Sequence, residues 1–364
     1  MTAVHVVVPD GVDDATRPSG GNTYDTRVCA GLARRGWAVS RHVARGRWPG
    51  PDAAARHSLG AALAGIPRGC VVLVDGLVAS AAPEVVVAEA HRLRVVVLLH
   101  LPRGHEAAGG IDGFPGRHAR TREDEAAVLR AVAGVIVPSR WTREWVVTTY
   151  GLTAARVDVV PPGVDAAPLA PGRAAGDRLA CIGAVVPTKG QDRLVDALTD
   201  LTDLTWSCQV VGSLAVEPSW ARRIARRVEG GGLGGRVRLR GPLPAADLSA
   251  VYAGTDLLVV PSRIETYGLV VTEALARGIP VVASHVGGLA EALGATGRGR
   301  PGVLVPPDDP SGLARALRRW LTDPEGRAAL RSAALARRGT LSDWSTTVEG
   351  VSAVLSTVRA GAVA

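Results

Sequence analysis

Short runs of apolar, mostly β-branched residues recur along the chain, and longer stretches with apolar positions every three or four residues separate them. The short runs predict buried strands and the longer stretches predict amphipathic helices. Alternation of this kind favours parallel sheets covered by helices. Twelve strands are expected, at residues 4–8, 37–43, 70–74, 94–100, 134–138 and 157–160, and at 179–183, 205–211, 236–239, 257–260, 280–283 and 302–305.

The alternation restarts after Pro161-Pro162-Gly163-Val164-Asp165, which predicts a linker between two doubly wound α/β domains. We expect residues 1–163 and 164–340 to form these domains, because one core seldom extends over 364 residues. Residues 341–364 have a helical pattern and are expected to pack back on the first domain. A ligand is expected between the domains, beyond the carboxyl ends of the strands.

The composition narrows the class of protein. Only 4% of residues are aromatic while 47% are hydrophobic, so Val, Leu, Ala and Ile must build the cores. The four cysteines lack metal-ligand spacing and are expected to be buried thiols in a reducing cytoplasm: Cys29, Cys70, Cys181 and Cys208. The first apolar run is interpreted as a strand, not a signal peptide, and no run approaches the roughly 20 residues of a membrane-spanning helix.

The chain is basic, with a net charge of +8 and a pI near 10.1. Its arginines are scattered and lack the interleaved aromatic residues of a base-stacking surface, so nucleic acid is not an expected partner. The densest cluster, at residues 222–227, has helical spacing and is interpreted as a solvated helix face. Peripheral membrane contact stays open without being favoured, and the oligomeric state is undetermined.

Among 42 basic residues, only Lys189 is a lysine, and it lies in the turn Pro187-Thr188-Lys189-Gly190 after a predicted strand. An ammonium group is a compact point charge that fits between phosphate oxygens, whereas guanidinium is a broad planar fork. At the start of a helix, its charge would add to the partial positive charge of the helix terminus. The turn therefore suggests an anion site, with a compositional accident as the alternative.

A second candidate segment follows the predicted strand 257–260. Gly278 and Pro280 would end its helix, and the amide groups of residues 266–269 would face phosphate or sugar oxygens. On a continuous helix Glu265 and Glu273 would differ by about 80° and about 12 Å. They are then too far apart to share a proton, but each carboxylate could accept hydrogen bonds from a separate diol of one long ligand.

Five short motifs, in this order, carry a family resemblance. They are Ser19-Gly20-Gly21-Asn22, Val137-Pro138-Ser139, Gly163-Val164-Asp165, Pro187-Thr188-Lys189-Gly190, and the segment 261–288 with its Glu-Thr-Tyr-Gly turn and two glutamates separated by seven residues. With them the chain resembles the retaining glycosyltransferases of family 4. The resemblance implies the GT-B fold, in which two Rossmann-like domains face each other across a cleft.

The resemblance also implies roles for individual residues. Glu273 would bind the ribose of a sugar nucleotide and Glu265 the hydroxyls of its sugar, while Lys189 would hold its diphosphate. His100 would reach the donor, so His100, Glu265 and Lys189 are the expected catalytic residues. Backbone contacts to the donor would come from Thr266, Tyr267, Gly268 and Leu269, and the glycine loop of Gly20 and Gly21 would let the backbone approach donor and acceptor.

The implied reaction moves a hexose-type sugar from a nucleoside-diphosphate sugar to a hydroxyl or other nucleophile of a small molecule, glycan or lipid. The sugar nucleotide is a substrate, and no cofactor or metal is expected; the acidic run 123–125 is interpreted as a solvated helix face. Many relatives have an arginine where this chain has Ala184, and Arg263 is a conceivable substitute. A nucleotide-sugar epimerase, a pseudo-glycosyltransferase and a non-catalytic sugar-nucleotide-binding protein remain alternatives. Donor base, sugar and acceptor stay open.

Overall fold

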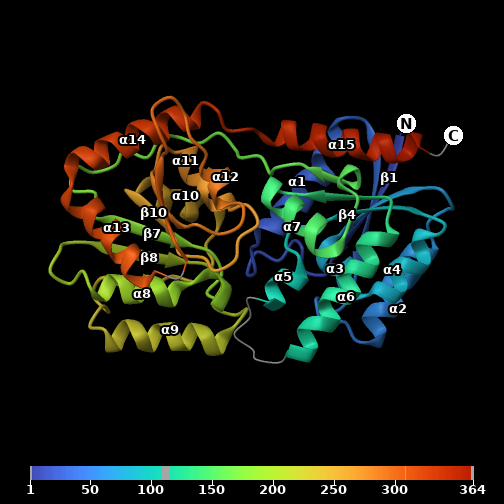
Figure 1. Ribbon diagram of the computed structural model, residues 1–364, viewed down its shortest axis with the longest axis horizontal. Coiled ribbons are helices and arrows are strands. Elements are labelled where there is room, and N and C mark those ends of the chain that lie inside the picture. The colour runs from blue at the N-terminus through green and yellow to red at the C-terminus, as the bar shows by residue number, and fades with distance from the viewer. Residues whose placement is uncertain (1, 109–114, 308, 362–364) are drawn as a thin grey trace. The chain divides into compact units, whose positions relative to one another are not determined.

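The computed structural model describes residues 2–108, 115–307 and 309–361 (Figure 1). The chain divides into two compact units. The first holds the residues up to 13, residues 21–163 and those from 343 on, and the second holds residues 14–20 and 164–342. The chain passes from the first unit to the second at Gly163–Val164 and returns at Ser342–Asp343. Both places lie outside helices and strands.

The first unit contains a six-stranded parallel sheet in the order β2-β1-β3-β4-β5-β6. Its strands are β1 (Thr2–Pro9), β2 (Trp37–Ala44), β3 (Val71–Asp75), β4 (Arg94–Leu98), β5 (Gly134–Val137) and β6 (Val157–Val159). Its helices are α1 (Gly20–Arg34), α2 (Ala53–Ala64), α3 (Gly76–Ala81), α4 (Pro83–Ala90), α5 (Arg103–Ala108), α6 (Pro115–Ala131), α7 (Arg140–Tyr150) and α15 (Trp344–Ala360).

Helices cover both faces of this sheet. Val7, Val72 and Val97 point to a core shared with α2, α4, α6 and α7. On the other face lie α1 and α15 (Figure 1). Helix α15 is held there by a hydrogen bond of 2.9 Å from Trp37 Nε1 to Ser352 Oγ and by close packing against α1. The C-terminal helix therefore belongs to the core of the first unit.

The second unit contains a six-stranded parallel sheet in the order β12-β11-β10-β7-β8-β9. Its strands are β7 (Arg178–Ile182), β8 (Ser207–Val211), β9 (Val237–Leu239), β10 (Leu257–Val260), β11 (Val281–Ser284) and β12 (Gly302–Val305). Its helices are α8 (Gln191–Thr199), α9 (Pro218–Gly230), α10 (Ala245–Ala253), α11 (Leu269–Leu275), α12 (Leu289–Leu293), α13 (Pro310–Thr322) and α14 (Pro324–Arg338).

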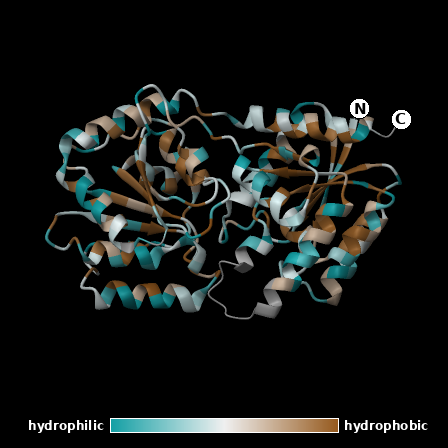
Figure 2. Ribbon diagram, viewed as in Figure 1, coloured by the Kyte–Doolittle hydropathy of each residue, from teal (hydrophilic) through white to brown (hydrophobic). Residues whose placement is uncertain are grey.

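Two apolar layers sandwich the second sheet. One joins it to α8, α9 and α13, and the other joins it to α10, α11, α12 and α14. The strands are the hydrophobic centre of each unit, and the helices turn polar residues outward (Figure 2). This confirms the predicted fold class, and every predicted strand has a counterpart whose ends differ by no more than two residues.

Two predictions about burial need correction. Cys29 and Cys70 are only half-buried, whereas Cys181 and Cys208 are buried as expected. Glu125 does not belong to a solvated helix face: it is fully buried, and its carboxylate accepts hydrogen bonds from four groups, namely Ser80 Oγ, the amides of Arg103 and Gly104, and the Tyr150 hydroxyl. A carboxylate that satisfies four donors can be buried because those bonds replace its hydration.

Across the described part of the chain, the helices are all too short or too polar to cross a bilayer.

Candidate functional site

Lys189 lies between a strand and a helix of the second unit, as predicted. Strand β7 ends at Ile182, a single 3₁₀ turn covers Pro187–Lys189, and α8 begins at Gln191. The Lys189 Nζ donates to Glu265 Oε2 at 2.5 Å, and these side chains are 32% and 14% exposed. Two predicted catalytic residues that lie 76 positions apart in the sequence therefore form a partly buried ion pair.

The two backbone segments that carry this pair are also joined. The amide of Arg263 donates to the carbonyl of Thr188 at 2.8 Å. Gly190 has φ +67°, and a Cβ atom there would lie 2.0 Å from the carbonyl oxygen of Pro261. Only glycine satisfies both conditions without a backbone shift, so Gly190 fixes the turn of Lys189 against the loop of Glu265.

These loops follow β7 and β10, which are neighbours in the sheet. From β7 the chain continues outward to β8 and β9, and from β10 it continues the other way to β11 and β12. The loops after such a pair of strands separate toward opposite faces, and ligands of open α/β sheets bind at this topological switch point. The ion pair lies at that place in the second unit.

Glu265 and Glu273 are not on one continuous helix. Gly268 adopts φ +97° directly before α11, so Glu265 lies in the preceding loop and only Glu273 is helical. The loop is held in place by the amide of Gly288, which donates to the carbonyl of Glu265 at 3.0 Å. The predicted rotation of about 80° between the glutamates therefore does not apply. Thr266, Tyr267 and Gly268 lie in this loop, and Leu269 is the first residue of α11.

Glu273 has a partner that sequence reasoning missed. The hydroxyl of the buried Tyr252 donates to Glu273 Oε2 at 2.6 Å. Burial raises the pKa of Glu273, and the negative charge of Asp165 raises it further, against the lowering effect of the Tyr252 hydrogen bond. Tyr252 belongs to an apolar helical stretch, where only its hydroxyl hinted at a polar role.

Arg263, the conceivable substitute for the family arginine at Ala184, is bound to a carboxylate in this structure. Its guanidinium forms two hydrogen bonds with the Asp192 carboxylate, at 2.7 and 2.6 Å, and a third with the carbonyl of Pro187. Burial acts to raise the pKa of Asp192, but Arg263 outweighs it and holds the pKa below its ordinary value. Arg263 thus holds the turn before Lys189 in this structure, and its role as a second cation for a diphosphate stays a prediction.

In the first unit, Gly21 lies against His100. Gly20 and Gly21 do not form the predicted glycine loop but are the first two residues of α1, and a Cβ atom on Gly21 would lie 3.1 Å from His100 Cδ2. His100 follows β4, which ends at Leu98, two residues earlier than predicted. The predicted glycine and histidine of this unit are therefore in contact.

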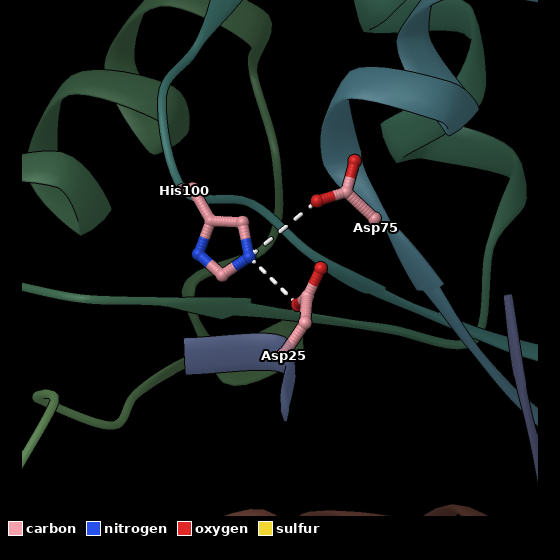
Figure 3. Close-up of side chains that lie close together, drawn as sticks. All are labelled: Asp25, Asp75 and His100. Atoms are coloured by element: carbon pink, nitrogen blue, oxygen red, sulfur yellow. Dashed lines mark hydrogen bonds and ion pairs between the residues drawn. The ribbon is translucent and has the colours of Figure 1, made fainter. Parts of the chain in front are cut away.

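Two carboxylates that sequence reasoning missed also meet His100 (Figure 3). His100 Nε2 lies 2.8 Å from Asp25 Oδ1 and 3.5 Å from Asp75 Oδ2. Asp75 ends β3, and Asp25 lies one helical turn after Gly21 on α1. Asp75 and His100 come at the ends of the neighbouring strands β3 and β4, so the strand pattern could have predicted that they meet. Asp25 lies on a helix, and only its spacing of four residues from Gly21 pointed to this site.

Burial and mutual charge control this cluster. Burial raises the pKa of Asp75 to about 7, and the charge of Asp25 contributes to the rise. Burial acts to lower the pKa of His100, but the two carboxylates outweigh it, so the pKa of His100 lies above its ordinary value. The ligand atoms of the three residues lie within 4.8 Å of one another, a spacing that could also hold a metal ion.

Comparison with known families decides the class of this chain. The family described as Glycosyltransferase Family 4 matches residues 18–167, and the family described as Glycosyl transferases group 1 matches residues 175–337. The chain belongs to the family 4 glycosyltransferases. The matched regions include Gly21 and His100 in the first unit and the Lys189–Glu265 pair in the second.

Individual relatives support this family. D-inositol 3-phosphate glycosyltransferase 1 of Catenulispora acidiphila is 34% identical over 251 residues, which are 63% of this chain and 58% of that protein. The D-inositol 3-phosphate glycosyltransferase of Frankia alni is 32% identical over 272 residues, which are 70% of this chain and 65% of that protein. The matches thus span less than two thirds of the length of these curated relatives.

Solved structures share the GT-B fold of this family 4 chain. Sucrose-phosphate synthase from Thermosynechococcus elongatus has a TM-score of 0.82 at 22% identity and covers all of both chains. Anabaena HepE in complex with UDP-glucose has a TM-score of 0.76 at 19% identity and covers 98% of this chain and 100% of that one. At these identities the likeness speaks for the fold alone.

Proposed function

We propose that this family 4 protein is a retaining glycosyltransferase that moves a hexose-type sugar from a nucleoside-diphosphate sugar to a hydroxyl or other nucleophile of an acceptor. The ion pair of Lys189 and Glu265 carries the proposal. It places a lone ammonium group and a carboxylate side by side at the switch point of a doubly wound sheet. The ammonium suits a diphosphate and the carboxylate suits sugar hydroxyls.

The donor would lie along the loops after β7 and β10. Lys189 would leave Glu265 to meet the diphosphate, which frees the Glu265 carboxylate to accept hydrogen bonds from sugar hydroxyls. Glu273, oriented by the Tyr252 hydroxyl, would accept hydrogen bonds from the ribose. The backbone of residues 266–269 would complete the donor contacts, and Ala184 would leave Lys189 as the principal side-chain cation.

Retention follows if bond making and bond breaking occur on one face of the sugar. The bond from the anomeric carbon to the phosphate oxygen breaks through an oxocarbenium-like state, and the acceptor oxygen bonds to the same carbon from the same side. The departing phosphate oxygen takes the acceptor's proton, so no protein nucleophile is needed. Lys189 stabilises the charge that develops on the leaving diphosphate.

The names of the relatives suggest the first compounds to try. The curated relatives are called D-inositol 3-phosphate glycosyltransferases, and one structural neighbour was solved with UDP-glucose. UDP-glucose is therefore the first donor to test, and inositol phosphate the first acceptor. Sugar nucleotides based on adenosine and guanosine belong in the same panel, because nothing in the described site selects the base.

The test is a thermal-shift screen across sugar nucleotides and nucleoside diphosphates. A ligand that binds only the native state stabilises it by about 2.7 kcal/mol at a concentration 100 times its Kd. We expect one nucleotide series to stabilise the protein, and to do so less in the Lys189→Gln variant. If no sugar nucleotide or nucleoside diphosphate stabilises the wild type, the proposal is wrong.

Product analysis with the stabilising donor then tests the reaction. An α-configured donor should give an α-linked product, detectable by NMR. Change of the sugar nucleotide without any acceptor would instead indicate an epimerase. Binding without transfer or hydrolysis over a broad acceptor panel would indicate a sugar-nucleotide-binding protein.

A further inference from the structure

We propose that Asp25 is a positioning residue, which holds the imidazole of His100 in its protonated form so that His100 acts as a hydrogen-bond donor and not as a base. This inference deepens the proposed function, on which it rests for the contact of His100 with substrate. Asp25 is a buried carboxylate that takes no part in the proposed donor contacts of Lys189, Glu265, Glu273 and residues 266–269.

The hydrogen bond between the two residues sets the first constraint. His100 Nε2 lies 2.8 Å from Asp25 Oδ1, and an ionised carboxylate can only accept. Nε2 must therefore carry a hydrogen atom when Asp25 is charged. The Asp25 side chain is 3% exposed and that of His100 is 17% exposed, so little water competes for this bond.

Helix α1 contacts the ring at two points. Gly21 approaches His100 Cδ2, and Asp25, one turn later, holds Nε2. The second carboxylate is fixed independently, because Asp75 Oδ1 accepts the amides of Leu77 and Val78 at 2.7 and 3.2 Å at the start of α3. The ring is thus clamped between two anchored elements, as the converging side chains of Figure 3 show.

The charge of the cluster sets the second constraint. Asp25 and Asp75 are 3% and 5% exposed, and two buried carboxylates so close together cannot both stay charged without a compensating cation. Asp25 Oδ2 is buried and has no hydrogen-bond donor among the described residues. The nearby Asp75 carboxyl, whose pKa is raised by burial and by the charge of Asp25, supplies a proton that the two carboxylates share. An imidazolium and one shared proton leave the cluster neutral.

A further group packed on the ring brings no charge. The ring of Tyr24 lies 5.3 Å from that of His100 and its hydroxyl donates to the carbonyl of Val160 at 2.7 Å. In this unit, His100 thus contacts the carboxyl groups of Asp25 and Asp75 and the ring of Tyr24. A protonated His100 cannot take the acceptor's proton, which agrees with transfer of that proton to the leaving phosphate.

NMR of histidine ring nitrogens tests the protonation state without any substrate. In protein labelled with ¹⁵N-histidine, the His100 signal is assigned among the eight histidines from a His100→Gln sample. We expect an imidazolium at pH 7.5 in the wild type. Asp25→Asn keeps the size of the side chain but removes its charge, and should lower the titration midpoint of His100 by about one pH unit, a tenfold change in proton affinity.

Two controls keep this test decisive. Asp25→Glu keeps the charge and should leave His100 protonated at pH 7.5. A wild-type His100 that is neutral at pH 7.5 overturns the proposal without any variant. Unchanged midpoints in Asp25→Asn also overturn it, and so does stoichiometric binding of Zn²⁺ or Mn²⁺ that Asp25→Asn abolishes, since the three residues would then be metal ligands.

Transfer kinetics test the consequence for catalysis. Asp25→Asn should lower kcat about tenfold at pH 8 with little change in the donor KM, and the difference should shrink toward pH 5.5, where His100 is protonated in both proteins. An equal loss at every pH would indicate a purely structural role and contradict the proposal. If the wild type shows no transfer, the proposed function fails. The NMR experiment still tests whether Asp25 keeps His100 protonated, because it needs no substrate.

Discussion

Replacing Lys189 by arginine keeps the charge of the proposed diphosphate site but changes its shape. In the structure the ammonium makes one contact of 2.5 Å with Glu265 Oε2, and the lysine stem passes over Gly183, where an added Cβ would lie 3.8 Å from it. A guanidinium could bind the same carboxylate through two parallel hydrogen bonds. Arginine would therefore stay with Glu265, whereas lysine can leave it for a phosphate.

The substitution should change ligand affinity much more than it changes the free energy of unfolding. Hydrogen bonds to charged groups contribute about 1.5–3 kcal/mol, and losing part of one such bond weakens binding about tenfold, since 1.4 kcal/mol is one factor of ten. Lys189→Arg should thus raise the Kd for the nucleoside diphosphate about tenfold, and Lys189→Gln about 30-fold or more. Because the pair is partly exposed, the free energy of unfolding should change by less than about 1 kcal/mol in Lys189→Arg.

Isothermal titration calorimetry with the nucleoside diphosphate selected in the thermal screen measures this difference, and urea unfolding measures stability. Glu265→Gln is the matched variant: it releases Lys189 from its partner, so affinity for the diphosphate should not fall, while the additional affinity due to the sugar should. Wild-type affinity in Lys189→Arg would refute the reasoning and make the single lysine a compositional accident. Equal weakening of diphosphate and sugar nucleotide by Glu265→Gln would refute the assigned roles.

Three further predictions concern the supports of the site. Gly190→Ala should destabilise the protein by clearly more than Gly232→Ala in urea unfolding, because both glycines have φ near +68° but only Gly190 faces a carbonyl 2.0 Å from the added Cβ. Asp192→Asn should lower stability at neutral pH and flatten its acid dependence: the pKa of Asp192 is depressed, so its contribution is present above the ordinary carboxyl pKa near 3.8 and is lost as the pH falls through the folded-state value. Tyr252→Phe should weaken nucleoside-diphosphate binding several-fold in calorimetry, since the Glu273 carboxylate loses the hydrogen bond that orients it.

The fold was readable because each strand is a short apolar run bounded by breakers, and a parallel sheet buries both faces of such a run. Strand β10 (Leu257–Val260), for example, is fully buried and matches its predicted range. Errors lie at strand ends, where a side chain such as Leu99 continues the apolar pattern after the ladder has stopped. A strand ends where its backbone hydrogen bonds to the neighbouring strand stop, and the residue types along the chain do not reveal that point.

The candidate site was only partly readable. Lys189 and Glu265 stood out by composition and motif, and the structure brings them into contact. Asp25 and Glu125 did not, because a polar residue on a helix is by default assigned to solvent. Their burial depends on partners brought from distant segments, such as His100 for Asp25 at a separation of 75 residues. Periodicity contains no information on such pairs.

The arginines explain why one lysine is informative. Several of them bind two main-chain carbonyls through two different nitrogen atoms: Arg92 binds those of Leu63 and Ile66, Arg327 those of Trp320 and Ala174, and Arg338 those of Ala276 and Ala167. A planar fork with five donors suits this fixed structural task, and an ammonium does not. At position 189 the cation instead makes one contact with a carboxylate at a sheet switch point. A group that must exchange that carboxylate for a phosphate benefits from having a single contact to break.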